Sequence, residues 1–469
     1  MSRSRSLAIG ALILLLAATP FIPRGDDEDG AIVPSGRGAY VARDAGGVGY
    51  GRVTPDLQAE IDRVVEGGLE AGRVLTRVGK VSVTQLAQAL VRCADLEGQR
   101  YCLGTGWTEA TQAEVQGQVA VAARSTLARA GSVETTGDLD AVAALRRLAA
   151  MSPLERARAE REELVAAARS VAKVWMLRHE IEGVPLPADF LARHPEARAL
   201  PGAAALARPV AGRDKKPTAK PTTKPSATPT PSPSPTRKPS KSPSSSPSKS
   251  PSPTSTPSPT KSPTKGPSAA PTSPGPKTAA DYPQRGSVLD PSQVADQIRT
   301  YWCGPTTMQM ITWGWKQQDW GAEHWAEALG TTSSGTAITD MVRVVNNNTG
   351  YDDPDHAGPY VVVDIAQYDF AEWMTLMMKH IVDYQAPVVL HPILLKKYYP
   401  YLDDDASGHF QVGRGYAKRD DKPVLLGYFE PWNQQRFDPS EPYISRVQWR
   451  PAYKSFRANQ AHFQHNIGV

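Results

Sequence analysis

The chain has 469 residues, a formal net charge of +5 and only three cysteines. This length exceeds what one hydrophobic core usually organises, which favours two domains joined by a linker. The sequence contains no C-x-x-C pair, no H-E-x-x-H string and no G-x-x-x-x-G-K-S/T string, so nothing in it supports a zinc site or a phosphate-binding loop. We therefore expect no metal, no cofactor and no nucleic-acid partner.

Residues 1–25 have the order of a bacterial secretory signal peptide. Arg3 and Arg5 precede a twelve-residue apolar run from Leu7 to Ala18, which is shorter than the roughly 20 residues of a membrane-spanning helix. This predicts a secreted or extracellular protein associated with the cell envelope. No clear A-x-A cleavage site follows, so an uncleaved N-terminal membrane anchor is the alternative. Residues 26–53 are expected to be an extended segment.

Residues 54–205 are predicted to form a helical domain, an antiparallel bundle. Leu57, Ile61 and Val64 recur at helical spacing, and Ser152-Pro153-Leu154-Glu155 has the residues of a helix start ahead of a run to about Glu182. The region is either an inhibitory pro-segment or an independent domain, and the long linker that follows favours independence.

Within this region, residues 93–107 are expected to be a loop. Cys93 and Cys102 lie nine positions apart in it, and an exported chain permits disulfides. We predict a bridge between them.

Residues 206–280 are predicted to be a disordered linker, because they consist largely of Pro, Ser, Thr and Lys with little apolar surface to bury. Lys215 to Ala280 carry ten Lys and one Arg but no acidic residue, and removing these eleven charges from +5 leaves −6 for the rest of the chain. The linker is expected either to bind anionic cell-wall polymers or to act as a solubilising tether.

Residues 281–469 are expected to form an α+β domain, since eight of the ten tryptophans lie there and predicted helices are followed by predicted strands. The predicted helices span 304–317, 321–329, 336–346 and 370–383. The predicted strands span 360–365, 387–394, 409–418 and 424–429.

Cys303 is the cysteine left without a predicted partner, and an odd cysteine in a secreted protein indicates either intermolecular pairing or a functional thiol. Gly304 and Pro305 follow it as a helix start, and a helix N-terminus lowers the pKa of a thiol. Gln297, six residues upstream, is a candidate to donate its amide to an oxyanion together with the Cys303 backbone N–H. This predicts a nucleophile with its oxyanion site.

A cysteine nucleophile also needs an imidazole base and a group that orients it. His409 begins one predicted strand and Glu430 ends the next. Adjacent antiparallel strands place side chains of the same face within hydrogen-bonding reach. We therefore predict a Cys303, His409, Glu430 triad.

With these residues, the C-terminal 190 residues or so resemble papain-fold cysteine peptidases, in the branch related to the double-glycine leader peptidases, family thirty-nine. The matching positions are Gln297, Cys303-Gly304-Pro305, Gly408-His409, Gly415-Tyr416 and Glu430-Pro431. The resemblance implies a papain-like α+β fold and acyl transfer through a thioester. It does not extend to the first 280 residues.

One departure from the family pattern is Glu430, where the family usually has Asp. Asn433 and Asp438 are therefore competing candidates for the third member of the triad. The expected activity is that of a monomeric cysteine peptidase or amide hydrolase with a peptide or protein substrate. The alternatives are an acyltransferase or peptidoglycan amidase on the same fold, and a binding module that has lost turnover.

Overall fold

The computed structural model describes residues 50–77, 81–129, 135–202, 277–437, 439 and 444–469. The predicted signal peptide, nearly all of segment 26–53, the predicted linker apart from its last residues, and Asp438 lie outside these ranges. The described parts of Met1–Ala207 and Pro274–Val469 belong to one compact unit.

The N-terminal part is mainly helical, as predicted, but it also contains three short strands. Its elements are α2 (Pro55–Arg77), α3 (Val83–Leu90), β1 (Cys93–Leu96), β2 (Gln99–Cys102), β3 (Gly106–Trp107), α4 (Gln112–Arg129), α5 (Ala141–Ala150), α6 (Pro153–Leu177), η1 (Arg178–Glu182), α7 (Phe190–Arg193) and η2 (Pro195–Ala199). The start of α6 is confirmed, because Ser152 and Glu155 form a capping box around it.

The C-terminal part mixes helices and strands, in agreement with the α+β expectation. Its elements are η4 (Ala279–Asp281), β4 (Arg285–Ser287), α8 (Cys303–Lys316), α9 (Gly321–Leu329), α10 (Ile338–Asn348), β5 (Val362–Asp364), α11 (Phe370–Val382), β6 (Val388–Leu390), β7 (Gln411–Arg419), β8 (Lys422–Phe429), α12 (Gln434–Phe437), β9 (Val447–Pro451), α13 (Ala452–Ala461) and β10 (Asn466–Gly468). All four predicted helices and all four predicted strands are present; the bounds of α9 agree with the prediction and the ends of the others are shifted.

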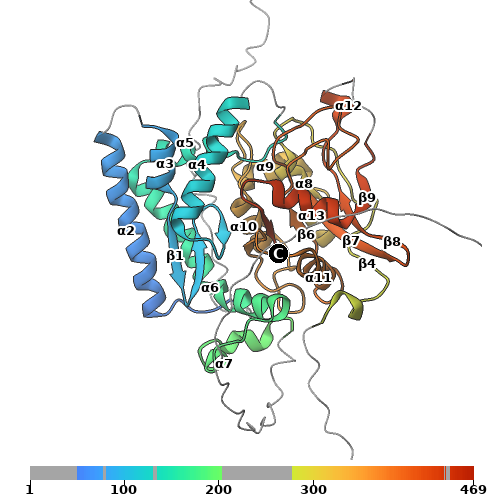
Figure 1. Ribbon diagram of the computed structural model, residues 1–469, viewed down its shortest axis with the longest axis horizontal. Helices are drawn as coiled ribbons and strands as arrows, with labels where there is room; N and C mark the ends of the chain where they lie inside the picture. The colour runs from blue at the N-terminus through green and yellow to red at the C-terminus, as the bar shows by residue number, and fades with distance from the viewer. Residues whose placement is uncertain (1–49, 78–80, 130–134, 203–276, 438, 440–443) are drawn as a thin grey trace, which may run out of the picture. The chain divides into compact units, whose positions relative to one another are not determined.

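One sheet runs through both parts in the order β1-β2-β3-β5-β10-β6-β7-β8-β9, with β4 also paired to β7. Figure 1 shows β4, β7, β8 and β9 side by side. The central β7 and β8 are antiparallel, and their register aligns Val412 with Phe429. This register brings the residues before β7 close to those after β8.

The prediction of two independent domains needs correction, because the N-terminal strands extend the C-terminal sheet. Residues 93–107, expected to be a loop, form the β1–β2 hairpin and β3, and β3 pairs in parallel with β5. The hairpin turn has positive φ at Glu97 and Gly98, which suits a tight two-residue connection. The edge strand of a hairpin sheet has unpaired backbone N–H and C=O groups, and here β5 pairs with the edge strand β3.

The predicted disulfide is confirmed. Cys93 and Cys102 face each other across β1 and β2 and are joined by a disulfide. The bridge therefore closes the hairpin that begins the shared sheet.

Both faces of the sheet are buried at its central strand β6, where alternate residues contribute to different cores. Val388 and Leu390 pack in a core with residues of α2, α6, α11 and α13, whereas Val389 packs in a second core with residues of α8, α9 and α10. The helices of the N-terminal part thus share a core with the C-terminal sheet, which explains why the two parts form one unit.

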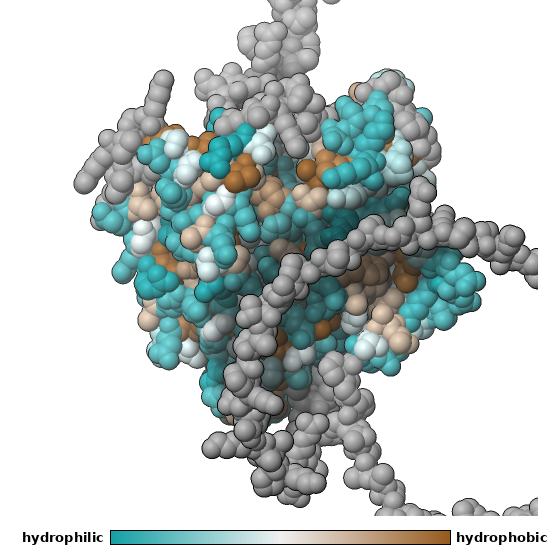
Figure 2. Space-filling view, in the orientation of Figure 1, coloured by the Kyte–Doolittle hydropathy of each residue, from teal (hydrophilic) through white to brown (hydrophobic). Residues whose placement is uncertain are grey.

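On the face drawn in Figure 2, the described apolar residues form small separate patches among hydrophilic ones. Among the described helices, none is long and apolar enough to cross a bilayer.

Candidate active site

Cys303 is the first residue of α8 and is fully buried. Gly304 is required beside it, since a Cβ at that position would lie 2.6 Å from Thr336 Oγ1. The backbone N–H of Phe410 hydrogen-bonds to the thiol. Cys303 therefore lies against the segment that carries His409.

Burial raises the pKa of the Cys303 thiol well above its ordinary value. Hydrogen bonds from the backbone amides of Phe410 and Gly304 act in the opposite direction but do not offset this effect. The lowered pKa expected from the helix N-terminus is therefore not found, because desolvation of the thiolate outweighs the helix dipole.

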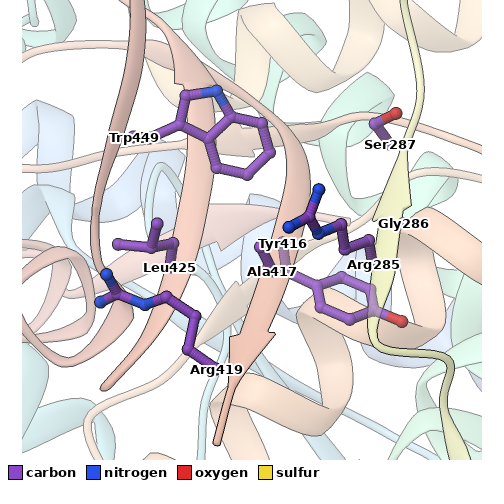
Figure 3. A pocket seen from close by; sticks show the side chains of 8 residues that line it. All are labelled: Arg285, Gly286, Ser287, Tyr416, Ala417, Arg419, Leu425 and Trp449. Atoms are coloured by element: carbon purple, nitrogen blue, oxygen red, sulfur yellow. The ribbon is translucent and has the colours of Figure 1, made fainter. Parts of the chain in front are cut away.

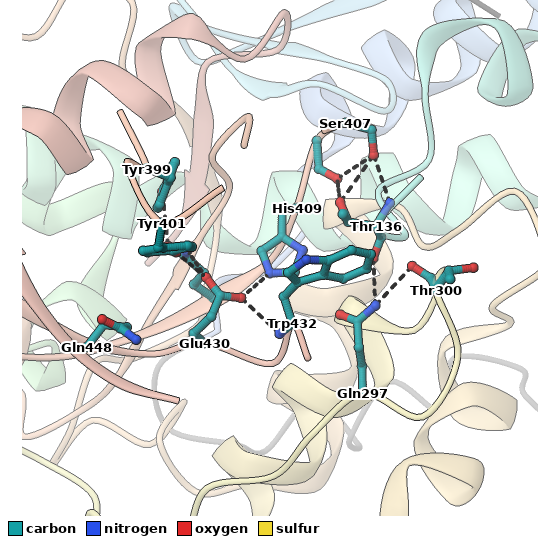
Figure 4. Close-up of polar contacts among 12 residues, drawn as sticks. Thr136, Gln297, Thr300, Tyr399, Tyr401, Ser407, His409, Glu430, Trp432 and Gln448 are labelled. Atoms are coloured by element: carbon teal, nitrogen blue, oxygen red, sulfur yellow. Dashed lines mark hydrogen bonds and ion pairs between the residues drawn. The ribbon is translucent and has the colours of Figure 1, made fainter. Parts of the chain in front are cut away.

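His409 lies just before β7 and Glu430 just after β8, and the two side chains are in direct contact. His409 Nε2 lies 2.6 Å from Glu430 Oε1, and both side chains are fully buried (Figure 4). His409 Nδ1 is buried without a hydrogen-bond partner among the described residues. His409 thus has one nitrogen held by a carboxylate and one nitrogen free for a proton.

Three further donors hold the Glu430 carboxylate. Oε2 accepts from Gln411 Nε2 at 2.7 Å and from the Tyr401 hydroxyl at 3.1 Å, and Oε1 accepts from the Trp432 backbone N–H at 3.0 Å. Burial raises the pKa of Glu430, but His409 and these hydrogen bonds outweigh it, so the pKa lies below its ordinary value. Glu430 is therefore ionised and fixed beside the imidazole.

The competing third members lie elsewhere. The Asn433 side chain hydrogen-bonds Asp296 rather than His409. Asp438 lies outside the described residues. Of the described alternatives, Glu430 is the one that contacts the imidazole.

Gln297 is fully buried close to the start of α8. Its Nε2 donates to the carbonyl oxygens of Arg299 and Thr300, at 3.0 and 2.9 Å, and lies 3.4 Å from the carbonyl oxygen of Thr136 (Figure 4). The backbone N–H of Cys303 donates to the same Thr136 oxygen at 3.3 Å. The two predicted oxyanion donors thus converge on one oxygen, which belongs to the N-terminal part of the chain.

A second histidine–carboxylate cluster is formed around Asp138, two residues after Thr136 in the sequence. Asp138 accepts from His391 Nε2 through Oδ1 and from His462 Nε2 through Oδ2, each at 2.8 Å. His391 is fully buried and makes these polar contacts within the core.

The cluster also has the residue types of a metal site, with ligand atoms within 4.8 Å of one another. The two imidazoles already hydrogen-bond to the Asp138 carboxylate. The Gly408 backbone also packs closely against this carboxylate, since a Cβ on Gly408 would lie 2.3 Å from Asp138 Oδ2. Hydrogen bonding accounts for the arrangement.

Sequence reasoning missed Thr136, Asp138 and Gln411. Gln411 lies two residues after His409, so strand alternation was a usable signal that both point to one face. Thr136 and Asp138 had no such signal, because they are more than 150 residues from the segment that they contact.

A groove elsewhere is formed by β4, β7, β8 and β9 (Figure 3). It is lined by Arg285, Gly286, Ser287, Tyr416, Ala417, Arg419, Leu425 and Trp449. None of the candidate catalytic residues lines it, so we do not assign it to the reaction.

Comparison with known protein families finds a similarity in the C-terminal part of the chain. No match was found to a curated protein or to a solved structure. The description of the matching family model is Peptidase_C39 like family, and the match spans residues 290–457, which include Gln297, Cys303, His409 and Glu430. The resemblance expected from the sequence is thereby confirmed, and the C-terminal part of this chain is similar to the Peptidase_C39 like family of papain-fold peptidases.

Proposed function

We propose that the C-terminal region is a cysteine peptidase or amide hydrolase that uses Cys303 as nucleophile and His409 as base. The observation that carries the proposal is the contact of 2.6 Å between His409 Nε2 and Glu430 Oε1. It leaves Nδ1 free, and the next residue of the chain, Phe410, hydrogen-bonds to the Cys303 thiol. Thiol acyl transfer needs an oriented imidazole and a thiol at a helix start, and here the segment that carries the imidazole contacts the thiol through Phe410.

The reaction follows from these roles. His409 Nδ1 takes the proton of the thiol, and Sγ attacks the carbonyl carbon of the substrate. The Cys303 N–H and the Gln297 amide hold the developing oxyanion. When the carbon–nitrogen bond breaks, His409 returns the proton to the leaving amine and a thioester remains, which water hydrolyses to a carboxylate and the free thiol. Glu430 stabilises the imidazolium throughout.

A peptide is the preferred substrate class, because the groups that meet at Thr136 already bind a peptide carbonyl. An acyltransferase or peptidoglycan amidase would form the same thioester and differ in the acceptor. Product analysis with and without added amines separates these reactions.

A binding module without turnover is the second candidate. The observation in its favour is the burial of Cys303, which raises the pKa of the thiol and so disfavours the reactive thiolate at neutral pH.

For location, we propose export and association with the cell envelope. The support is the signal-like order of residues 1–25 and the basic composition between Lys215 and Ala280. Retention on isolated cell walls that declines with added salt would support binding of the linker to anionic polymers.

The decisive test of the enzymatic proposal is digestion of a peptide pool by the full chain, with products identified by mass spectrometry. The variants are Cys303→Ser, His409→Ala and, as a control, His324→Ala, whose imidazole is exposed on α9. The set is assayed in the wild-type chain and in an Asp138→Ala chain, because Asp138 holds the segment whose Thr136 carbonyl contacts the oxyanion donors.

Products that disappear in Cys303→Ser and His409→Ala but persist in His324→Ala are expected. If no chain yields products and His409→Ala leaves alkylation of Cys303 unchanged, the enzymatic proposal fails and the binding module is favoured.

A further inference from the structure

We propose that Thr136–Leu139 form an inhibitory segment that occupies the candidate active site and keeps the chain latent. The inference rests on the proposed function, since it concerns regulation of the same site. It assigns a role to a stretch of the N-terminal part that has no other role in the mechanism.

The first observation is the position of the Thr136 carbonyl. Its oxygen accepts from the Cys303 backbone N–H at 3.3 Å and lies 3.4 Å from Gln297 Nε2. These are the two donors assigned to the oxyanion of a substrate. A substrate carbonyl cannot enter this position while Thr136 fills it.

Thr136 is also held beside the base. Its backbone N–H donates to Ser407 Oγ at 2.9 Å, and its hydroxyl donates to the Gly408 carbonyl oxygen at 2.6 Å (Figure 4). Gly408 directly precedes His409. The segment therefore contacts both the residue that carries the nucleophile and the residue that precedes the imidazole.

Gly137 lets the backbone approach the nucleophile closely. Its φ is +113°, and a Cβ at this position would lie 2.5 Å from the carbonyl of Tyr301 and 3.0 Å from the Cys303 nitrogen. Only glycine avoids both the strain and the collision. A residue with a side chain would push the segment out of the site.

The backbone on the other side of Gly137 is fixed by Thr336. The Thr336 N–H donates to the Gly137 carbonyl oxygen at 2.8 Å, and the Leu139 N–H donates to the Thr336 carbonyl oxygen at 3.0 Å. The segment is thus bonded as a short added strand, which is a common way to bind an extended peptide.

Asp138 anchors the segment in the C-terminal part. Its carboxylate lies between His391 and His462, and burial opposes its ionisation, but the two imidazoles hold its pKa well below the ordinary value. Asn466 Oδ1 and the Gln464 N–H bind the other ring nitrogens of His391 and His462. Every ring nitrogen of this anchor therefore has a partner.

The burial of the site residues shows that a substrate has no access to the thiol while the segment is in place. Cys303, His409, Glu430 and Gln297 are each 0 % exposed, and so is Thr136. A peptide from solution reaches the thiol only after the segment moves. The same burial raises the pKa of the thiol, so removal of the segment also favours the thiolate.

The test measures the rate of Cys303 alkylation by iodoacetamide in the full chain without reductant. The reagent reports Cys303, because Cys93 and Cys102 are joined in a disulfide. Asp138→Ala removes the anchor, whereas Asp138→Asn keeps its shape, with an oxygen to accept from one imidazole and an N–H to donate to the other.

The matched control is Asp364→Ala. Asp364 is a buried carboxylate that bonds His465 Nδ1 at 3.0 Å and the Thr108 hydroxyl at 2.6 Å, so it also joins the two parts of the chain. It does not contact Thr136–Leu139 in any described hydrogen bond.

We expect Asp138→Ala to accelerate alkylation by about 10-fold or more, which corresponds to about 1.4 kcal/mol of lost protection. Asp138→Asn and Asp364→Ala should stay within about 2-fold of the wild type. A synthetic peptide of residues 135–140 added to Asp138→Ala should slow alkylation again, because it refills the vacated position.

Thermal unfolding first establishes which variants fold. If Asp138→Ala does not fold, Thr136→Val takes its place; it loses the hydroxyl bond to Gly408 and should accelerate alkylation by about 3-fold.

Equal alkylation rates in the wild type and in the folded segment variants would overturn the proposal. Cleavage of the Thr136–Gly137 bond by Cys303 in the wild type would also overturn it, because the segment would then be a substrate. Faster alkylation without peptide hydrolysis in any variant would support occlusion by the segment and contradict the enzymatic proposal, so the two failures are distinguishable.

Discussion

Two of the histidine–carboxylate centres in the described part of the chain, one around Glu430 and one around Asp138, use their imidazoles differently. In the first, His409 gives Nε2 to Glu430 and keeps Nδ1 without a partner among the described residues. In the second, Asp138 and neighbouring groups bind every ring nitrogen of His391 and His462. An imidazole must have a free nitrogen to transfer a proton, so the first centre suits catalysis and the second suits anchoring.

The centres also differ in how the chain assembles them. His409 and Glu430 are 21 residues apart and lie next to the paired ends of two neighbouring strands, β7 and β8. Asp138 is 253 residues from His391 and 324 residues from His462. The first centre forms from one strand pair, whereas the second exists only once the N-terminal part has docked.

The largest expected effect comes from removing the free imidazole. His409→Ala in the Asp138→Ala background should lower kcat for peptide hydrolysis on the order of 10²–10⁴-fold, because general base catalysis is lost. His324→Ala in the same background should leave kcat unchanged. Steady-state kinetics on a peptide identified in the pool assay measures both, and equal losses in the two variants would contradict the difference between the centres.

The anchoring centre should matter for stability. Asp138→Ala leaves two imidazoles buried without their carboxylate, and we expect the free energy of unfolding to fall by about 3–5 kcal/mol, as for other broken buried pairs. Denaturant titration measures this change. Asp138→Asn should lose much less, since an amide can satisfy both imidazoles, and a comparable loss in this variant would argue against a hydrogen-bonded anchor.

Replacing Glu430 should lower kcat less than replacing His409. In Glu430→Gln, an amide N–H₂ faces the donors from Gln411, Tyr401 and Trp432, so we expect about a 10–100-fold lower kcat with KM little changed.

The pH dependence has a defined sign. Because the folded-state pKa of Glu430 is lowered, the carboxylate contributes stability that is fully present above its ordinary pKa of 4.5 and is lost as the pH falls through the lower folded value. Unfolding titrations of Glu430→Gln should therefore show a weaker decline in acid than the wild type. An unchanged decline would mean that another group is responsible.

A buried ionisable group that lacks a hydrogen-bond partner among the described residues should give the smallest effect. Lys173 Nζ has no hydrogen-bond partner among the described residues, and burial lowers its pKa to about 7. The unfolded chain therefore binds more protons between pH 7 and the ordinary pKa of 10.5, so the free energy of unfolding rises with pH across this range.

Lys173→Met removes the buried charge at low cost in shape. It should stabilise the fold by roughly 1–2 kcal/mol at pH 6 and flatten the pH dependence. Chemical denaturation at pH 6 and pH 9 measures both effects, and a destabilised variant at pH 6 would show that the ammonium has a favourable partner.

Local patterns predicted much of the C-terminal part. Periodicity and capping residues gave α9 and the start of α6 with the bounds that the structure has, and the Cys-Gly-Pro string gave the start of α8. The N-terminal hairpin was missed because its strands have four residues each, too few for alternation to register. The predicted separation into two domains was wrong for a related reason, because β3 pairs with β5, which lies far along the chain.

The sequence by itself determined the candidate residues for the reaction: Cys303 at a helix start, Gln297 before it, and His409 and Glu430 next to the ends of successive strands. These positions depend on short-range rules of capping and strand pairing. Only the tertiary structure decided their burial and their contacts, because both are properties of the packed chain. Burial raises the pKa of the thiol, and chain packing brings the Thr136 carbonyl to the two proposed oxyanion donors. Contacts across more than 150 residues leave no periodic trace in the sequence, so the anchoring of Asp138 became visible only in the fold.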